Sequence, residues 1–380
     1  MNERRALPLA MGSRKLLIVD DSIKKLRDEL DEYISGIKYM NFLKFSKEVL
    51  FTHEIQANNH IEMYKDDVET IYEVIHRKSK ITDPVKKRRI MNLYRGYKYI
   101  LERKDIDKDN LRDLYAILSK DLLSKDDLSN MGDYYRINPV YIFYSSNFDK
   151  QPDQGVDGSE VDKYMDILLE YANTGNEGLS KAELFLKSQI MHFYFVYIHP
   201  YYDINGRTSR TTAMWYLLKN KSYPFIIFNR AIELCKNEYY KVIRETKKYA
   251  DVTFFLNYMM EHTFIELQKD YIMNMIKNNC NYDLTSVDYQ SLRYILSMKS
   301  NLTYSDFVQY YNLQNEFKGY RDVFIDMLLP LLDKGIIIEG RETKKHITPT
   351  EFNHTFCLNS SMIDLNDPKI KKIEIARKIK

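Results

Sequence analysis

The stretch HPYYDINGRTSR, residues 199–210, determines how the rest of the chain is interpreted. A segment rich in apolar and aromatic residues, with helical character, leads into His199, and Pro200 prevents that helix from continuing. A short loop follows, and a second helix is predicted after Gly206, running to about Asn220. The stretch is therefore a loop between two helices, with polar side chains at the start of the second.

The residue types of this loop favour an anionic ligand. Arg207 and Arg210 are three residues apart, so both guanidinium groups lie on one helix face near the positive end of the helix dipole. The first backbone N–H groups of a helix bind phosphate, and Gly206 permits close approach. Asp203 offers the oxygen ligand that Mg²⁺ takes beside phosphates, and His199 is placed as a general base. The set indicates phosphoryl or nucleotidyl transfer.

Each element of the stretch alone has an ordinary structural explanation. A His-Pro pair usually terminates a helix, and arginines three residues apart usually form a solvated face. Their joint occurrence within twelve residues, between two helices, favours the functional interpretation.

The composition is that of a globular, mainly helical protein. The 380 residues are enough for two folded units. The net charge is +3, from 57 basic and 54 acidic residues, so the overall charge favours binding to neither nucleic acid nor a membrane. Only 12 glycines and 9 prolines favour helices over sheets. No apolar run reaches the roughly 18 residues that span a bilayer. The cysteines lack metal-ligand spacing and indicate a reducing cytoplasm; they are Cys235, Cys280 and Cys357.

Periodicity predicts helices over most of the chain, with one β-like stretch before the motif. That stretch, residues 134–146, contains Val140, Tyr141 and Ile142, and is followed by a polar loop, residues 147–158, so an extended hairpin is expected. The predicted helices cover residues 22–37, 41–54, 65–77, 85–103, 110–123, 161–173, 180–198, 287–298, 304–311 and 321–334.

The motif resembles the signature of the Fic family, His-Pro-Phe-x-Asp/Glu-Gly-Asn-Gly-Arg-x-x-Arg, with two departures. Tyr201 replaces phenylalanine, a mild change at a core position. Ile204 replaces a glycine of the anion loop, and a β-branched side chain disfavours positive φ and narrows access of the backbone to phosphate. The resemblance covers about residues 26–271 and implies a mainly α fold, a Fic-type helical bundle with a β-hairpin flap.

Two neighbouring segments add to the resemblance. The family often carries Gly-x-Tyr/Phe-Arg before its flap, and Gly-Asp-Tyr-Tyr-Arg at residues 132–136, followed by residues 139–146, is similar. The resemblance implies that Val140, Tyr141 and Ile142 align a target chain by strand addition. Residues 237–240 are similar to a segment near the adenine, which makes Tyr240 a candidate for nucleobase contact, with an ordinary core tyrosine as the alternative.

The activity implied by the resemblance is protein adenylylation with ATP and Mg²⁺. His199 would take the proton of a Ser, Thr or Tyr hydroxyl, the oxygen would attack the α-phosphate, and pyrophosphate would leave. Asp203 would hold Mg²⁺. The α-phosphate would be stabilised by Asn205 and Gly206, and the β- and γ-phosphates would be bound by Arg207 and Arg210.

A segment before the motif resembles the inhibitory helix of many Fic proteins, Ser/Thr-x-x-x-Glu-Gly/Asn. Thr52 takes its first position, and Gln56 replaces the glutamate that would pair with Arg210. A neutral amide cannot form the bidentate ion pair, so weakened autoinhibition is expected. Glu62 in a shifted register and an ordinary surface helix are the alternatives.

The C-terminal region has the element order of a winged helix-turn-helix: three helices, then a hairpin predicted at residues 335–340 and 345–348. It would bind DNA or a protein, and the two roles are left open. We expect a flexible leader (1–20), an N-terminal helical region (21–125), the Fic core (126–280), the winged helix (284–350) and a basic tail (351–380).

Several alternatives remain open at this point. The leading interpretation is a bacterial, cytoplasmic enzyme whose protein substrate docks on the flap, with a homodimer among the open oligomeric states. A degenerate Fic protein with little transferase activity, owing to Ile204, would instead act as a DNA- or protein-binding regulator. A third interpretation is a Fic transferase that uses a donor substrate other than ATP.

Overall fold

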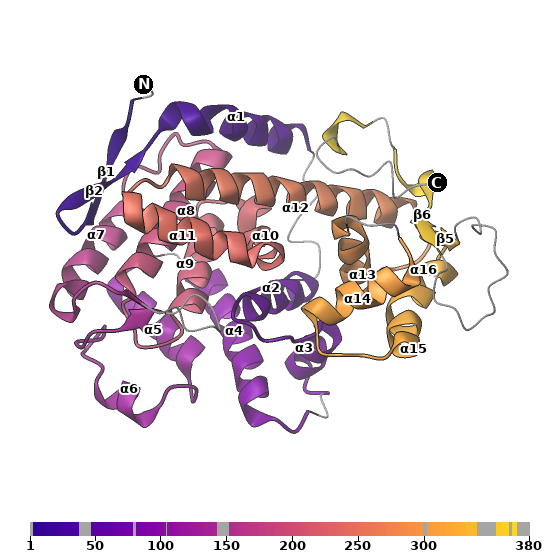
Figure 1. Ribbon diagram of the computed structural model, residues 1–380, viewed down its shortest axis with the longest axis horizontal. Helices are drawn as coiled ribbons and strands as arrows, with labels where there is room; N and C mark the ends of the chain where they lie inside the picture. The colour runs from indigo at the N-terminus through magenta and orange to yellow at the C-terminus, as the bar shows by residue number, and fades with distance from the viewer. Residues whose placement is uncertain are drawn as a thin grey trace. The chain divides into compact units, whose positions relative to one another are not determined.

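The computed structural model describes residues 3–37, 47–78, 81–103, 105–142, 152–298, 302–339, 355–364 and 367–370. The described part is mainly α-helical, as predicted, with three two-stranded sheets (Figure 1). The chain divides into two units. Unit 1 contains Met1–Phe45 and Val74–Thr263, and unit 2 contains Ser46–Glu73 and Phe264–Lys380.

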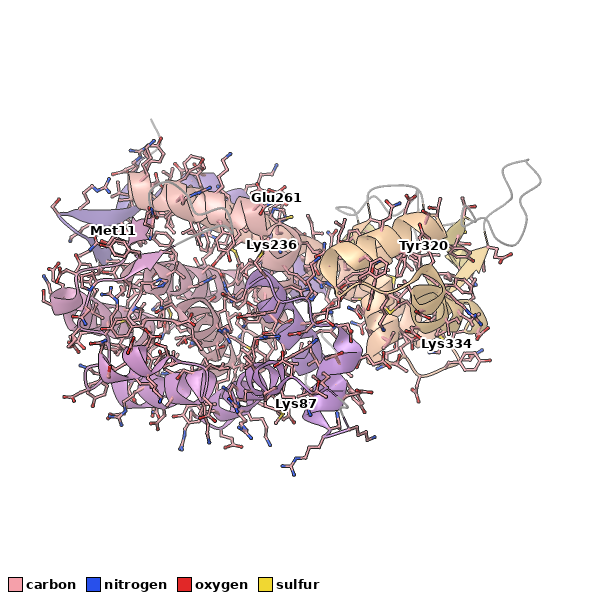
Figure 2. All side chains as sticks on the ribbon, turned by 60° about the horizontal axis from the view of Figure 1, so that its bottom comes forward. Met11, Lys87, Lys236, Glu261, Tyr320 and Lys334 are labelled. Carbon is pink, nitrogen blue, oxygen red and sulfur yellow. The ribbon has the colours of Figure 1, made fainter. Side chains whose placement is uncertain are left out.

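The flexible leader predicted for residues 1–20 is wrong, because strands β1 (Arg5–Met11) and β2 (Arg14–Ile18) form an antiparallel hairpin. Its apolar residues alternate, so one face is buried, and Leu9 and Leu16 have no exposed surface. Met11 marks the turn end of the hairpin in Figure 2. The hydroxyl of Tyr194 donates to the carbonyl of Ala10 over 2.7 Å, which holds this hairpin in unit 1.

Unit 1 is built around helix α8 (Lys181–Ile198), whose residues are buried on nearly every face, as predicted. Ser180 and Glu183 close a capping box at its start. Helix α9 (Asn205–Lys219) packs beside it, and α1 and α7 also contact it. The other helices of this unit are α1 (Asp20–Gly36), α4 (Pro84–Glu102), α5 (Lys108–Ser119), α6 (Lys125–Ser129), α7 (Val161–Asn173), α10 (Phe228–Leu234) and α11 (Lys236–Tyr249).

The predicted hairpin before the motif is present but differs in its bounds. Strand β3 (Tyr141–Ile142) pairs antiparallel with β4 (Asp153–Gln154), so the second strand lies inside the predicted loop, residues 147–158. Before β3, Arg136 forms only an isolated bridge with Met131. The rest of the predicted stretch, residues 143–146, lies outside the described residues.

Unit 2 joins a segment from early in the chain to the C-terminal region. Helix α2 (Lys47–Ile61) belongs to it, and not to the N-terminal helical region in which it was expected. The other helices are α3 (Val68–Ile75), which ends in residues assigned to unit 1, α12 (Thr253–Asn279), which begins in unit 1, α13 (Ser286–Ser297), α14 (Tyr304–Gln314), α15 (Tyr320–Val323) and α16 (Leu329–Asp333). A π-helical turn, Phe324–Leu328, precedes α16. Pro330, near the start of α16, has no N–H and cannot donate a backbone hydrogen bond.

The predicted C-terminal order, three helices and then a hairpin, is found. However, β5 (Ile337–Glu339) pairs with β6 (Phe356–Leu358), which lies in the segment expected to be a basic tail, residues 351–380. The strand predicted at residues 345–348 lies outside the described residues. Among the described helices, none combines the length and the apolar character needed to cross a bilayer.

Candidate active site

His199 ends helix α8 in a left-handed conformation, with φ 54° and ψ 62°. Its backbone N–H donates to the carbonyl of Phe195 over 2.9 Å, which closes the helix, and Pro200 then turns the chain away. The ring Nδ1 lies 3.3 Å from the carbonyl oxygen of Val196. Because a carbonyl can only accept, Nδ1 carries the proton of the neutral ring, and Nε2 carries the lone pair.

The surroundings of this imidazole keep it neutral. Burial lowers the pKa of His199 to about 3, and the nearby cations of Lys247 and Arg136 act in the same direction. The hydrogen bond to Val196 opposes this shift without overcoming it. A neutral imidazole with Nε2 unprotonated is the form that a general base requires.

The loop after His199 keeps the backbone shape expected of a glycine, although isoleucine occupies the position. Ile204 has φ 66° and ψ 11°, and its side chain is buried. This conformation costs an L-residue about 1–2 kcal/mol, and a β-branched residue finds it especially unfavourable. The carboxylate of Asp203 accepts from the N–H of Ile204 over 2.6 Å and supports the turn. Isoleucine disfavours positive φ, and Ile204 adopts it nevertheless, so the loop is strained at this residue.

Asn205 holds the loop from within. Its side-chain oxygen accepts from the N–H of Tyr201 over 2.9 Å, and its amide donates to the carbonyl of Tyr201 over 2.8 Å. The side chain is therefore engaged with the loop backbone. A contact of Asn205 with the α-phosphate would come from its backbone N–H at the start of α9.

The first turn of α9 presents N–H groups and two arginines. The N–H of Thr208 donates to the carbonyl of Ile204, so the amides of Asn205, Gly206 and Arg207 precede the first helical hydrogen bond. Arg207 and Arg210 are both buried, at 6% and 1% exposure. Within the described residues, Nε of Arg207 has no hydrogen-bond partner. A buried guanidinium N–H of this kind suits a phosphate oxygen.

Asp203, the predicted magnesium ligand, is exposed at the surface of the loop. Its residue type and its position immediately before the helix start fit a hydrated Mg²⁺ shared with phosphates. Behind the loop, Tyr201 is fully buried and stacks on Tyr115 with ring centroids 3.5 Å apart, so it packs as expected of the family phenylalanine.

Arg136 is the main site residue that sequence analysis did not assign. Its side chain is 1% exposed and donates to four carbonyl groups. Nε reaches the carbonyl of His199 over 2.7 Å and Nη2 that of Ile198 over 3.2 Å, at the end of α8. The other two carbonyls belong to Asn138 and Val156, which flank the flap strands. The signal was present, because Arg136 ends the quoted Gly-Asp-Tyr-Tyr-Arg element.

Lys247 is a second unassigned residue. It lies on α11, and its ammonium is 3.5 Å from the carboxylate of Asp153 on flap strand β4. We call the four contacts of Arg136 the clamp. Gly155 lies against it, because an added Cβ there would be 2.7 Å from Nη2 of Arg136 and 3.1 Å from Cβ of His199. The flap, the end of α8 and α11 are thus closely packed around the imidazole.

The remaining predicted site residues of unit 1 lie in the flap and on helix α11. In the flap, Tyr141 is 62% exposed, whereas Val140 and Ile142 are buried. Tyr240 is partly buried, with its ring centroid 5.1 Å from that of Tyr239. Its proposed contact with a nucleobase stays a prediction.

The predicted regulatory residues lie on α2 in unit 2. Thr52 and Gln56 are both buried, so this is not an ordinary surface helix. The side-chain amide of Gln56 donates to the carbonyl of Asp66 and to Oδ1 of Asn315, each over 3.2 Å. Its pairing with Arg210 stays a prediction.

Comparison with solved structures supports the fold. A Fic family protein from Desulfovibrio desulfuricans G20 is 19% identical, over 93% of this chain and 98% of that one, with a TM-score of 0.57. A fragment of Fic-1 from C. elegans (16% identity, 68% and 72% covered, TM-score 0.47) and a Fic domain containing signaling protein from Bacteroides thetaiotaomicron (15% identity, 65% and 96% covered, TM-score 0.42) are too distant to carry an argument. Comparison with curated proteins finds no match.

The sequence profile of the Fic/DOC family matches residues 105–217. This segment begins just before α5, contains the described flap strands and ends in α9, so it includes both Arg136 and the whole motif loop. The chain therefore carries a Fic/DOC family domain at residues 105–217.

Proposed function

We propose that this protein is an adenylyltransferase that moves AMP from ATP to a Ser, Thr or Tyr hydroxyl of a target protein. The proposal rests chiefly on the left-handed turn at Ile204. This turn sets the start of α9, with the amides that precede its first helical hydrogen bond and with Arg207, one short loop away from the neutral imidazole of His199. An anion site beside a base is the arrangement that nucleotidyl transfer needs.

In the proposed reaction, Nε2 of His199 takes the proton of the target hydroxyl, and the oxygen forms a bond to the α-phosphorus of ATP. The bond from the α-phosphorus to the bridging oxygen breaks, and pyrophosphate leaves with that electron pair. The amides of Asn205 and Gly206 stabilise charge on the α-phosphate, and Arg207 and Arg210 bind the outer phosphates. Asp203 would hold Mg²⁺, which neutralises phosphate charge when bound.

The target chain is proposed to dock on the flap. Within the described residues, strand β3 pairs with β4 over two residues, and Tyr141 projects into solvent. An extended target segment can add to such a strand through main-chain hydrogen bonds, which would fix the hydroxyl beside His199.

The test is transfer of label from α-labelled ATP to protein, with wild type compared with His199→Ala. His76→Ala is the matched control, since His76 is also partly buried and lies outside the motif. We expect label with wild type and with the control, and loss of label with His199→Ala. Equal labelling by all three proteins would contradict the assignment of His199 as the base.

A second candidate function is favoured by the same Ile204. Its buried β-branched side chain takes the place of a glycine, and a loop that binds ATP poorly would leave a regulator acting through the C-terminal region. Calorimetry with ATP and Mg²⁺ separates the two, because only the enzyme requires binding. A gel shift with random DNA tests the regulator. Three basic residues of its proposed wing could contact phosphates but lie outside the described residues; they are Arg341, Lys344 and Lys345.

The proposal also includes weakened autoinhibition through Gln56. We expect Gln56→Glu to lower self-labelling if the new carboxylate reaches Arg210. The hydrogen bonds of Gln56 to Asp66 and Asn315 act against this, because a carboxylate cannot donate to the carbonyl of Asp66. Equal self-labelling by the two forms, at equal folded fraction, would remove the regulatory role.

A further inference from the structure

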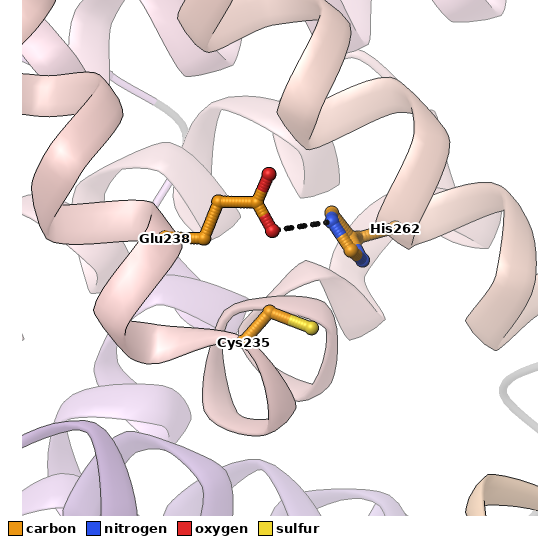
Figure 3. A group of neighbouring side chains, drawn as sticks. All are labelled: Cys235, Glu238 and His262. Atoms are coloured by element: carbon orange, nitrogen blue, oxygen red, sulfur yellow. Dashed lines mark ion pairs between the residues drawn. The ribbon is translucent and has the colours of Figure 1, made fainter. Parts of the chain in front are cut away.

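Three potential metal ligands converge on one side of unit 1, outside the motif loop. They are Cys235, at the junction of α10 and α11, Glu238 in the first turn of α11, and His262 on α12. One ligand atom from each, a sulfur, a carboxylate oxygen and an imidazole nitrogen, lies within 4.8 Å of the others. Figure 3 shows the three side chains directed toward one another.

The local sequence explains why the ligands meet. Cys235 and Glu238 are three residues apart at a helix start, so they occupy the same side of the first turn. Nε2 of His262 approaches from the neighbouring helix and is 3.6 Å from Oε2 of Glu238. Ligand atoms around a tetrahedral zinc ion are about 3.3–3.8 Å apart, given its bond lengths of about 2.0–2.3 Å. Nε2 of His262 and Oε2 of Glu238 already have this spacing, and small side-chain rotations would bring Sγ of Cys235 to the same distance from both.

A buried tyrosine holds two of the ligands in place. Tyr258 lies one turn before His262 on α12, and the two ring centroids are 4.5 Å apart. The hydroxyl of Tyr258 donates to the backbone carbonyl of Cys235 over 3.2 Å. One side chain, 5% exposed, thus positions both the imidazole and the backbone that carries the thiol. Such outer contacts are characteristic of ligands that are oriented for a metal.

The exposure of the cluster suits an ion that enters from water. Cys235 is not part of a disulfide and is partly buried, while the side chain of Glu238 is 58% exposed and that of His262 20%. One side therefore remains open for a water molecule as fourth ligand. In Figure 2, Lys236 and Glu261, the chain neighbours of Cys235 and His262, mark the place. A thiolate and a carboxylate together neutralise a divalent ion.

The donor types select among metals. Mg²⁺ and Ca²⁺ require oxygen ligands, whereas sulfur with imidazole nitrogen and one carboxylate suits zinc. We propose that Cys235, Glu238 and His262 bind one zinc ion, with water as the fourth ligand. The ion joins the α10–α11 junction to α12.

The competing explanation is an exposed ion pair between Glu238 and His262, with a cysteine nearby. Such a pair contributes little to stability and needs no thiol. It accounts neither for the position of Cys235 nor for the contacts of Tyr258. The two explanations differ in whether the thiol takes part, and this decides the experiment.

The test is zinc binding by metal-free, tag-free full-length protein, in competition with a chromophoric chelator. We expect one equivalent of zinc to bind to wild type and Cys235→Ser to weaken binding at least about tenfold, since even changes to outer-shell partners cost this much. His262→Gln should do the same. Cys280→Ser, which changes another partly buried cysteine, in unit 2, is the matched control and should bind as wild type does.

Cobalt provides a readout that reports the thiol directly. Cobalt bound to wild type should give a thiolate-to-metal charge-transfer absorption, and this absorption should be absent in Cys235→Ser and unchanged in Cys280→Ser. Circular dichroism confirms that each variant is folded. Absence of stoichiometric zinc binding, or binding that Cys235→Ser leaves unchanged, overturns the proposal.

Discussion

The two ends of the motif loop achieve left-handed backbone in different ways. At the first end, His199 is held by Arg136, which lies 63 positions earlier and donates to the last carbonyls of α8. At the second end, Ile204 is held by its immediate neighbours, through Asp203 and through the hydroxyl of Thr208, which donates to the Ile204 carbonyl over 2.8 Å. The backbone of His199 therefore depends on tertiary structure, and that of Ile204 depends on local sequence.

The largest effect expected from this comparison is at the first end. Arg136→Ala removes a donor from four carbonyl groups, two of them in buried hydrogen bonds, and opens a cavity, so we expect a loss of about 3 kcal/mol or more in the free energy of unfolding. Urea denaturation measures it. The control Arg112→Ala, at an exposed arginine, should cost less than about 0.5 kcal/mol. Equal losses in the two variants would show that Arg136 is not a clamp.

A smaller change at the same end is Gly155→Ala. The new methyl group would be 2.7 Å from Nη2 of Arg136 and 3.1 Å from Cβ of His199, so the clamp must shift. We expect about 1–3 kcal/mol of destabilisation, with reduced label transfer in protein that is still folded. Gly319→Ala, whose nearest contact would be at 3.4 Å, is the control. Unchanged stability and labelling would mean that the clamp tolerates displacement.

The second end is tested by comparing Ile204→Gly with Ile204→Ala, since both remove the buried side chain. In ordinary helical backbone alanine is the more stable by about 0.5–1 kcal/mol, but at φ 66° we expect glycine to be the more stable by about 1 kcal/mol. Thermal or urea unfolding gives the order. Ala213→Gly, within α9, should show the ordinary preference. If alanine is also preferred at 204, the left-handed turn is absent in solution.

The smallest expected effect concerns pH. Because the cation of Lys247 disfavours the imidazolium, Lys247→Met should raise the pKa of His199 from about 3, and the acid limb of label transfer should move to higher pH. NMR titration of the His199 ring measures the shift directly, with Lys248→Met as a control. A pKa that does not rise would remove Lys247 from the electrostatics of the site.

The same pKa has a consequence for stability. The folded value of about 3 lies below the unfolded value of about 6.5, so between these the unfolded chain binds the additional proton. His199 therefore contributes to a loss of stability as pH falls through this window. His199→Asn should reduce the pH dependence of the free energy of unfolding there.

The difference between the two ends also explains what could be predicted from the sequence. The proposed base, the proposed anion loop and the helix start lie within twelve residues, so the local residue types are enough to propose them. The role of Arg136 and the pairing of Lys247 with Asp153 join distant segments, and no local pattern encodes such contacts. No helix is predicted for α12 because it is apolar on most faces and its amphipathic signal is weak.

Other differences have local causes. The N-terminal hairpin was taken for a leader because its short apolar patch, Ala6 to Met11, was not interpreted as an alternating strand. The cluster at Cys235 was missed because His262 is separated from it in sequence and meets it only through the packing of α12 against α11. The hairpin and the cluster could therefore be recognised only from the folded structure.

The central claim is that the loop from His199 to Arg210 presents the α-phosphate of ATP to a protein hydroxyl. Its most direct test is parallel transfer from α-labelled and γ-labelled ATP, with pyrophosphate release measured in the same reaction. We expect incorporation of the α label only, with one pyrophosphate released for each AMP transferred. Incorporation of the γ label, or pyrophosphate release without protein labelling, would contradict it.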